Sequence, residues 1–187
     1  GHRVVLRVRR LPPLQERVVD LPEEVLPLSW LLGQWVGVGT GQYPTIDDFR
    51  FGQELSFTCD GRPFIAMHSR SWILDDDGNR QRPGATESAY FRPRPDNEFE
   101  ALFAHPTGYT EVWHGKVTVS EILDATITRA SLEMTTDSVM RTASAKEYLG
   151  GQRLYGLAPD GDLAWTFDMA AVGEPLGNHL AAKLKRV

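Results

Sequence analysis

With 187 residues, 41% of them hydrophobic, and a formal net charge of −5, the chain is expected to form a single domain with its own core, or one domain preceded by an arm. The acidic balance argues against a general nucleic-acid surface, and the lack of an apolar run of about 20 residues argues against a membrane span. The single cysteine, Cys59, cannot form an internal disulfide, so a reducing, cytoplasmic setting is expected.

The N-terminal segment differs in charge from the rest of the chain. Residues 1–20 carry five arginines against one glutamate and one aspartate, and Pro12-Pro13 interrupts them. We expect a flexible basic arm here, followed by a single domain over residues 21–187. Two alternatives stay open for the arm: a mobile solvated tail, or a segment that lies on the acidic body or binds something anionic.

The segment from Pro22 to Leu32 predicts a short helix, in which apolar residues recur at helical spacing. Asp20 is a candidate N-cap, and Pro27 limits the length of the helix. We expect this helix to plug one end of the fold and to lead into the first strand.

Residues 33–46, GQWVGVGTGQYPTI, alternate at period 2, which is typical of a strand. One face of this strand carries Gly33, Trp35, Gly37, Gly39, Gly41 and Tyr43. Each glycine within a strand destabilises the fold by roughly 0.5–1 kcal/mol relative to alanine. Four glycines on one face therefore indicate that something approaches this face closely: another strand at a barrel corner, or a flat ligand. We expect Trp35 to be buried at the barrel floor, where the N-terminal segment crosses.

After residue 46 nearly all signals are β. Short alternating segments recur about every 10–14 residues and are separated by turn sequences, including Asp60-Gly61 and a two-residue hairpin at Asp160-Gly161. Three separate strands are expected over residues 122–129, 132–134 and 139–142. About ten antiparallel strands predict a sandwich or a closed barrel, and the glycine-rich first strand favours a barrel with room for one small ligand.

The common catalytic signatures are absent from the sequence, among them the G-x-S-x-G, H-E-x-x-H and phosphate-loop motifs. His68 and His114 are expected to be exposed strand residues, and His105 to serve turn geometry in the sequence HPTG. His179 differs, because it opens the last strand, which neighbours the first strand in a closed barrel. Strict alternation would turn His179 away from the apolar face of Leu180 and Ala182, unless it lies at the rim before regular pairing begins or a bulge resets the register.

Several separated motifs occur in a characteristic order over about residues 25–187. They are Gly33-x-Trp35-x-Gly37-x-Gly39, Tyr43-Pro44-Thr45-Ile46, Gly61-x-Pro63-Phe64, Glu87-x-x-Tyr90-x-Arg92, Thr107-Gly108-x-x-Glu111-Val112 and Pro175-Leu176-x-x-His179-Leu180-x-Ala182. Together they resemble the nitrobindin family. The resemblance implies an all-β, ten-stranded antiparallel barrel of the lipocalin or fatty-acid-binding-protein-like type, with one ferric haem b at its mouth.

The resemblance also implies the roles of individual residues. His179 corresponds to the axial iron ligand, and Gln42 to a residue beside the haem. The open sixth position would bind nitric oxide, and ferric iron would isomerise peroxynitrite to nitrate. Ala85 stands where many members have a histidine, so no distal imidazole is expected opposite His179.

Two alternatives to a haem enzyme stay open. One is a carrier of a fatty acid or another small apolar ligand, which an arginine or tyrosine holding a carboxylate inside the barrel would favour. The other is a barrel whose pocket has filled with side chains. The expected partners are the small molecules nitric oxide and peroxynitrite, without nucleic acid or membrane, and a homodimer is an open alternative to a monomer.

Overall fold

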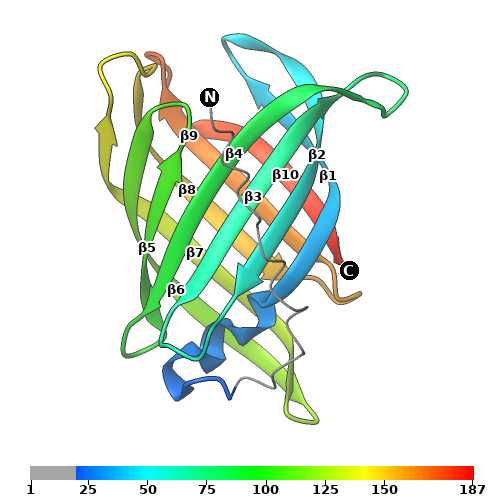
Figure 1. Cartoon of the computed structure of the whole chain (residues 1–187), viewed down its shortest axis with the longest axis vertical. Coiled ribbons are helices and arrows are strands. Elements are labelled where there is room, and N and C mark those ends of the chain that lie inside the picture. Colours follow the sequence, from blue (N-terminus) through cyan, green and yellow to red (C-terminus); the bar gives the residue numbers. More distant parts are fainter. Residues whose placement is uncertain (1–19) are drawn as a thin grey trace, which may run out of the picture.

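The computed structural model describes residues 20–187, so nearly all of the arm expected at residues 1–20 lies outside the described residues. The described chain consists of one short 3-10 helix, η1, followed by ten strands (Figure 1). Their bounds are η1 Glu23–Leu31, β1 Gly33–Tyr43, β2 Ile46–Thr58, β3 Ile65–Leu74, β4 Arg80–Pro93, β5 Glu98–His105, β6 Tyr109–Leu123, β7 Thr126–Arg141, β8 Tyr148–Leu157, β9 Leu163–Ala171 and β10 Gly177–Arg186.

The ten strands form one closed antiparallel barrel, which confirms the predicted fold class. Each strand pairs with its neighbours in sequence, and β1 closes the ring by pairing with β10. The hairpins β1–β2, β3–β4, β5–β6, β7–β8 and β9–β10 lie at one end, which we call the mouth, and η1 lies at the other end, the floor (Figure 1). Within residues 20–187, no helix is long and apolar enough to cross a membrane.

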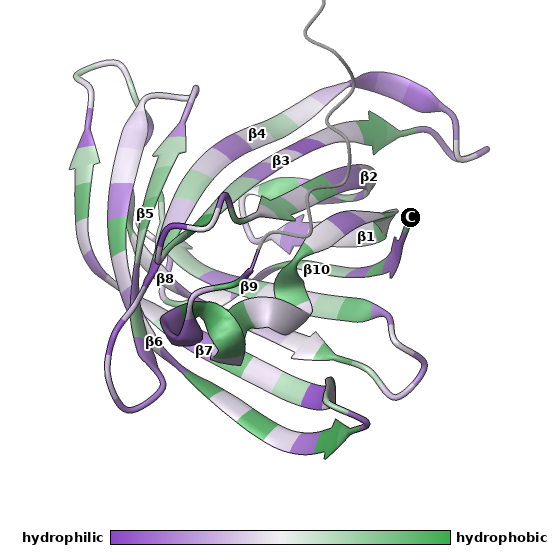
Figure 2. Ribbon diagram, turned by 60° about the horizontal axis from the view of Figure 1, so that its bottom comes forward, coloured by the Kyte–Doolittle hydropathy of each residue, from purple (hydrophilic) through white to green (hydrophobic). Residues whose placement is uncertain are grey.

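The floor is closed by η1, as the sequence predicts. Val25, Leu28 and Leu31 are fully buried, and Figure 2 shows the helix lying across the end of the barrel. Pro27 lies inside the helix and cannot donate a backbone hydrogen bond, which fits a short 3-10 element. The expected cap at Asp20 is wrong, because Pro22 occupies the N-cap position and no side chain caps the helix.

Trp35 is completely buried at this end, which confirms its expected position. Its indole Nε1 donates to the Leu31 carbonyl at 2.9 Å, so the first strand is fastened to the helix. The Arg186 guanidinium lies over the indole ring, 4.2 Å from its centroid, and donates to the carbonyls of Leu32 and Trp30. Trp35 therefore ties together the helix, the first strand and the end of the last strand.

The glycines of β1 make room for protein atoms. A Cβ on Gly37 would collide with the backbone and side chain of β10 at Lys183 and Leu184, and one on Gly39 would lie 2.5 Å from the Phe51 ring. A Cβ on Gly41 would collide with the Phe49 ring. Of the two explanations for these glycines, close packing of neighbouring strands and rings is therefore the right one, and a flat ligand against this face is wrong.

The strands are longer and fewer than the sequence predicts around residues 122–142. A single strand, β7, replaces the three expected there, and β6 continues to Leu123. The connecting turn is Asp124-Ala125, and both residues have positive φ (48° and 59°). Positive φ is uncommon for residues other than glycine, so the sequence gives no turn signal at this place. Similarly, the Asp160-Gly161 turn spans residues 158–162 and is not a two-residue hairpin.

Candidate functional site

The structure places His179 in a β-bulge at the mouth. In the pairing of β10 with β9, Asn178 pairs with Asp168 but Leu180 pairs with Phe167, so His179 is the extra residue. Ala182 and Leu184 still face the core, where they are buried. The bulge therefore resolves the register conflict, because His179 and the inward residues of the same strand all lie on the inner side.

The imidazole of His179 is held among three aromatic rings from three other strands. Its centroid lies 5.5 Å from that of Tyr43, 6.0 Å from that of Phe167 and 6.3 Å from that of Phe49, in edge-on geometries. Tyr43 is itself fixed, since its hydroxyl donates to the Met169 carbonyl at 3.1 Å and accepts from the Ala171 amide at 3.0 Å. The orientation of the His179 ring is thus set by packing.

A hydrogen bond selects the tautomer of His179. Its Nδ1 lies 2.9 Å from the backbone carbonyl oxygen of Gln42, which can only accept. Nδ1 therefore carries the proton, and Nε2 keeps the lone pair that a metal ion needs. Burial lowers the pKa of His179, the hydrogen bond to Gln42 opposes this, and the charge of Arg153 lowers the pKa further. The imidazole is consequently neutral at neutral pH.

Gln42 contributes to this site through its main chain. Its exposed side chain lies at the rim, where the amide Nε2 donates to Asn178 Oδ1 at 3.3 Å. Asn178 in turn donates to Asp168 at 3.1 Å. The two predicted cofactor residues, Gln42 and His179, are therefore brought together, whereas Gly33 and Trp35 of the same motif lie at the floor and support the fold.

The walls of the mouth are mostly apolar and open. Inward-facing residues from five strands pack on the core yet stay partly exposed, namely Phe49, Ile73, Tyr109, Val139 and Met169. Ala85 of β4 is exposed at the same end, where its carbonyl accepts from Ser71 at 2.9 Å. Within residues 20–187 no group of three or more histidine, cysteine or acidic residues could hold a bare metal ion. One neutral imidazole in an apolar mouth instead fits a haem, which needs a single axial ligand.

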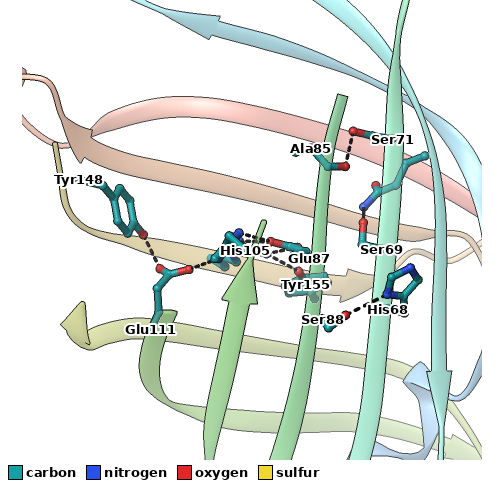
Figure 3. Close-up of polar contacts among 12 residues, drawn as sticks. His68, Ser69, Ser71, Ala85, Glu87, Ser88, His105, Glu111, Tyr148 and Tyr155 are labelled. Carbon is teal, nitrogen blue, oxygen red and sulfur yellow. Dashed lines mark hydrogen bonds and ion pairs between the residues drawn. The ribbon is translucent and has the colours of Figure 1, made fainter. Parts of the chain in front are cut away.

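Sequence reasoning missed a set of buried polar side chains below the mouth, which we call the inner polar cluster. It consists of Glu87, His105, Glu111, Tyr148, Arg153 and Tyr155 (Figure 3). Arg153 donates to both oxygens of Glu87 at 2.7 and 2.8 Å and to the Tyr155 hydroxyl at 3.2 Å. Glu111 lies 2.5 Å from both His105 Nε2 and the Tyr148 hydroxyl.

The cluster is kept charged in the barrel interior by its own pairing. Burial acts to raise the pKa of Glu87, but the charge and hydrogen bonds of Arg153 outweigh it and lower that pKa. Burial likewise acts to lower the pKa of Arg153, and Glu87 raises it well above its usual value. The guanidinium also lies over the rings of Phe103 and Phe167, at 4.6 and 4.7 Å from their centroids.

The turn expected at His105 is present, because the Gly108 amide donates to the His105 carbonyl at 3.0 Å, but the expectation missed the buried side chain of His105. His105 is the last residue of β5, and its side chain is only 7% exposed. It continues the inward face of Phe99, Ala101 and Phe103 at period 2, which is the signal that could have placed it inside. His68 and His114 are exposed, as expected. Position 85 is alanine, so the expectation that this position supplies no distal imidazole stays a prediction, and the nitrogens of His105 face carboxylates instead, at 2.5 Å (Glu111) and 3.6 Å (Glu87).

Comparisons with known proteins agree with this geometry. Residues 24–186 match the family described as "THAP4-like, heme-binding beta-barrel domain". The chain is 49% identical over 160 residues to a peroxynitrite isomerase of Nocardioides sp., covering 86% of this chain and 91% of that protein. It is 40% identical over 183 residues to a ferric nitrobindin-like protein of Kineococcus radiotolerans, covering 90% and 96% of the two chains.

A solved structure shares the fold. The crystal structure of Rv2717c from M. tuberculosis superposes with a TM-score of 0.80 at 34% sequence identity, covering 90% of this chain and 99% of that one. The match of the family over nearly the whole described barrel, together with these relatives, shows that the chain belongs to the nitrobindin family of THAP4-like haem-binding β-barrel domains.

Proposed function

We propose that this protein binds one haem b at its mouth through His179 and, in the ferric state, isomerises peroxynitrite to nitrate and binds nitric oxide. The observation that carries the proposal is the bond from His179 Nδ1 to the Gln42 carbonyl, which leaves Nε2 as a free, neutral donor. The relative from Nocardioides sp. that is named peroxynitrite isomerase, at 49% identity, supports the activity.

Each residue of the mouth has a definite task in this proposal. When bound, the haem supplies a Lewis-acidic iron on which the peroxynitrite anion rearranges to nitrate. His179 holds the cofactor, and Tyr43, Phe49 and Phe167 keep its imidazole in one orientation. The apolar wall excludes water, so that the reacting fragments stay together. The Gln42 side chain, exposed at the rim, is available to donate to a haem propionate.

The alternative of a fatty-acid carrier is less well supported. Arg153 and Tyr155 do lie inside the barrel, as that alternative requires. However, Glu87 already binds the Arg153 guanidinium through both oxygens. A ligand carboxylate would have to displace the Glu87 carboxylate from this bidentate contact, and leaving a buried charge unpaired costs about 3–5 kcal/mol. The cluster thus occupies the place that a fatty-acid headgroup would need.

A titration with hemin tests the assignment. Wild-type protein should give a sharp Soret band at one hemin per chain, and His179→Ala should abolish it while the circular dichroism spectrum stays that of a β-barrel, because His179 is only half-buried. His68→Ala and His114→Ala are matched controls, since both residues are exposed on the outer surface. His105→Ala is not a suitable control, because His105 belongs to the inner polar cluster. If His179→Ala binds hemin as wild type does, the ligand assignment is wrong and the carrier is the better proposal.

The remaining expectations about the setting of the protein stay predictions. They are the cytoplasmic location, the basic arm ahead of a single domain, the homodimer, and the absence of nucleic-acid and membrane partners. The homodimer can be checked by light scattering of the hemin-loaded protein.

A further inference from the structure

On the side that faces β10, the mostly apolar wall of the mouth includes Tyr109, which lies beside the inner polar cluster. Because the barrel is a ring of ten strands, the strand farthest from β10 is β5, with β4 and β6 on either side of it. The mouth end of β5 is the β5–β6 hairpin, in which His105 pairs with Tyr109. His179 and the side chains of this hairpin therefore lie at the same end of the barrel, on opposite sides of the mouth.

Tyr109 still reaches the open mouth. It shares the inner face of β6 with Glu111 and Trp113, which are both buried. Its ring stacks on His105 with centroids 4.3 Å apart and lies 5.0 Å from the Tyr148 ring. Tyr109 stays partly exposed, whereas Tyr148 is buried. Its phenol is therefore a polar group of the hairpin that a ligand in the mouth can meet, beside the exposed Thr107.

The ring on which Tyr109 stacks is itself held in place. Glu111 bonds both His105 and Tyr148 at 2.5 Å, and Glu87 lies 3.6 Å from the other nitrogen of His105. The bond to Glu111 occupies Nε2 of His105, so the ring cannot turn without breaking a buried contact. The inner polar cluster thus acts as a rigid base beneath Tyr109.

We propose that Tyr109 is the hydrogen-bond donor that faces the ligand on the open side of the cofactor, where it stabilises negative charge on a ligand oxygen and selects anionic ligands such as peroxynitrite. This inference rests on the proposed haem site. Ala85 stands where many members of the family have a distal histidine, and its methyl group cannot donate a hydrogen bond. Tyr109 would supply the donor instead.

The protonation state of Tyr109 suits this role. Burial, and next the charge of Glu111, raise its pKa to about 12, while a hydrogen bond with Thr107 acts in the opposite direction. Tyr109 therefore keeps its proton at neutral pH and donates without ionising. A hydrogen bond to a charged acceptor is worth about 1.5–3 kcal/mol, so its loss should weaken binding of an anion about tenfold or more.

The test compares Tyr109→Phe with Tyr90→Phe in the hemin-loaded protein. Tyr109→Phe removes only the hydroxyl and keeps the ring on His105, whereas Tyr90 is 54% exposed on the outer surface. Two quantities are measured: the fluoride dissociation constant of the ferric form, and the carbon monoxide stretching frequency of the ferrous complex. Tyr109→Phe should weaken fluoride binding about tenfold or more and raise the stretching frequency, because the donor is lost. Tyr90→Phe should change neither quantity.

The outcomes separate this inference from the haem assignment. If Tyr109→Phe binds hemin with the wild-type Soret band but neither quantity changes, Tyr109 does not face the ligand, and the haem site stands. If Tyr109→Phe alters the Soret band or releases hemin, its role is to retain the cofactor, and the inference is wrong. If the wild-type protein itself fails to bind hemin, both the proposed function and this inference are wrong.

Discussion

The ion pair between Glu87 and Arg153 should contribute strongly to the stability of the barrel. Their side chains are 13% and 3% exposed, and the two oxygens of Glu87 accept from the guanidinium at 2.7 and 2.8 Å. Glu87→Gln keeps the shape and one acceptor oxygen, but it removes the negative charge that pairs with the buried Arg153 guanidinium. Breaking a buried pair in this way costs about 3–5 kcal/mol, and we expect Glu87→Gln to lose that much unfolding free energy.

The matched control removes both charges. In Glu87→Gln/Arg153→Met, a flexible apolar side chain takes the place of Arg153 among the rings of Phe103 and Phe167, and no unpaired charge is left. This double variant should recover about 2 kcal/mol or more relative to Glu87→Gln alone. Urea unfolding of the haem-free protein, followed by tryptophan fluorescence, measures each value. A loss below about 1 kcal/mol in Glu87→Gln would show that water reaches the pair and would refute the reasoning.

Two further predictions concern the floor and the mouth. Trp35→Ala should destabilise the barrel by about 3–5 kcal/mol in the same urea assay, because the ring is fully buried and its Nε1 bonds the Leu31 carbonyl; a loss under about 1 kcal/mol would contradict its place in the floor. His179 has a pKa below its usual 6.5, so the folded protein favours the neutral imidazole. As the pH falls below 6.5, His179 is protonated in the unfolded chain before it is protonated in the folded protein, so the unfolding free energy declines. Hemin should stay bound until the pH falls through the lowered pKa of His179 in the folded protein. Release of hemin at or above pH 6.5 in a spectrophotometric titration would contradict this prediction.

The overall fold follows from local patterns that a sequence shows directly. Alternation at period 2 and turn sequences at regular spacing predict the strands, and closure follows from a β1 strand whose glycines admit a close neighbour. The failures have local causes as well. Asp124-Ala125 forms a turn without glycine, so the strand expected over residues 122–129 runs across the boundary between β6 and β7. Pro22 fills the N-cap position, so Asp20 has no role as a cap.

The inner polar cluster could not be predicted from the sequence, for a different reason. Its members come from four strands, β4, β5, β6 and β8, and Glu87 and Arg153 are 66 positions apart in the chain. Each looks like an ordinary polar residue in its own strand. Only the register of the strands around the ring brings two carboxylates, an imidazole and a guanidinium to one level of the barrel. The local signs are polar residues on inward positions, such as Arg153 between Gly151 and Tyr155, and His105 after Phe103.

The position of His179 depends on where regular pairing stops. The ladder between β1 and β10 ends at Gly41 and Leu180, so the next pair along it would be Gln42 and His179. On their other sides, both strands are irregular at the same level: β1 shifts its register against β2 between Gly41 and Tyr43, and β10 shifts against β9 between Asn178 and Leu180. The Gln42 carbonyl lies just beyond the last pair of this ladder, where a side-chain donor can reach it. The imidazole Nδ1 donates to this carbonyl at 2.9 Å. The same break in the ladder therefore turns His179 toward the mouth, fixes its tautomer and leaves Nε2 free.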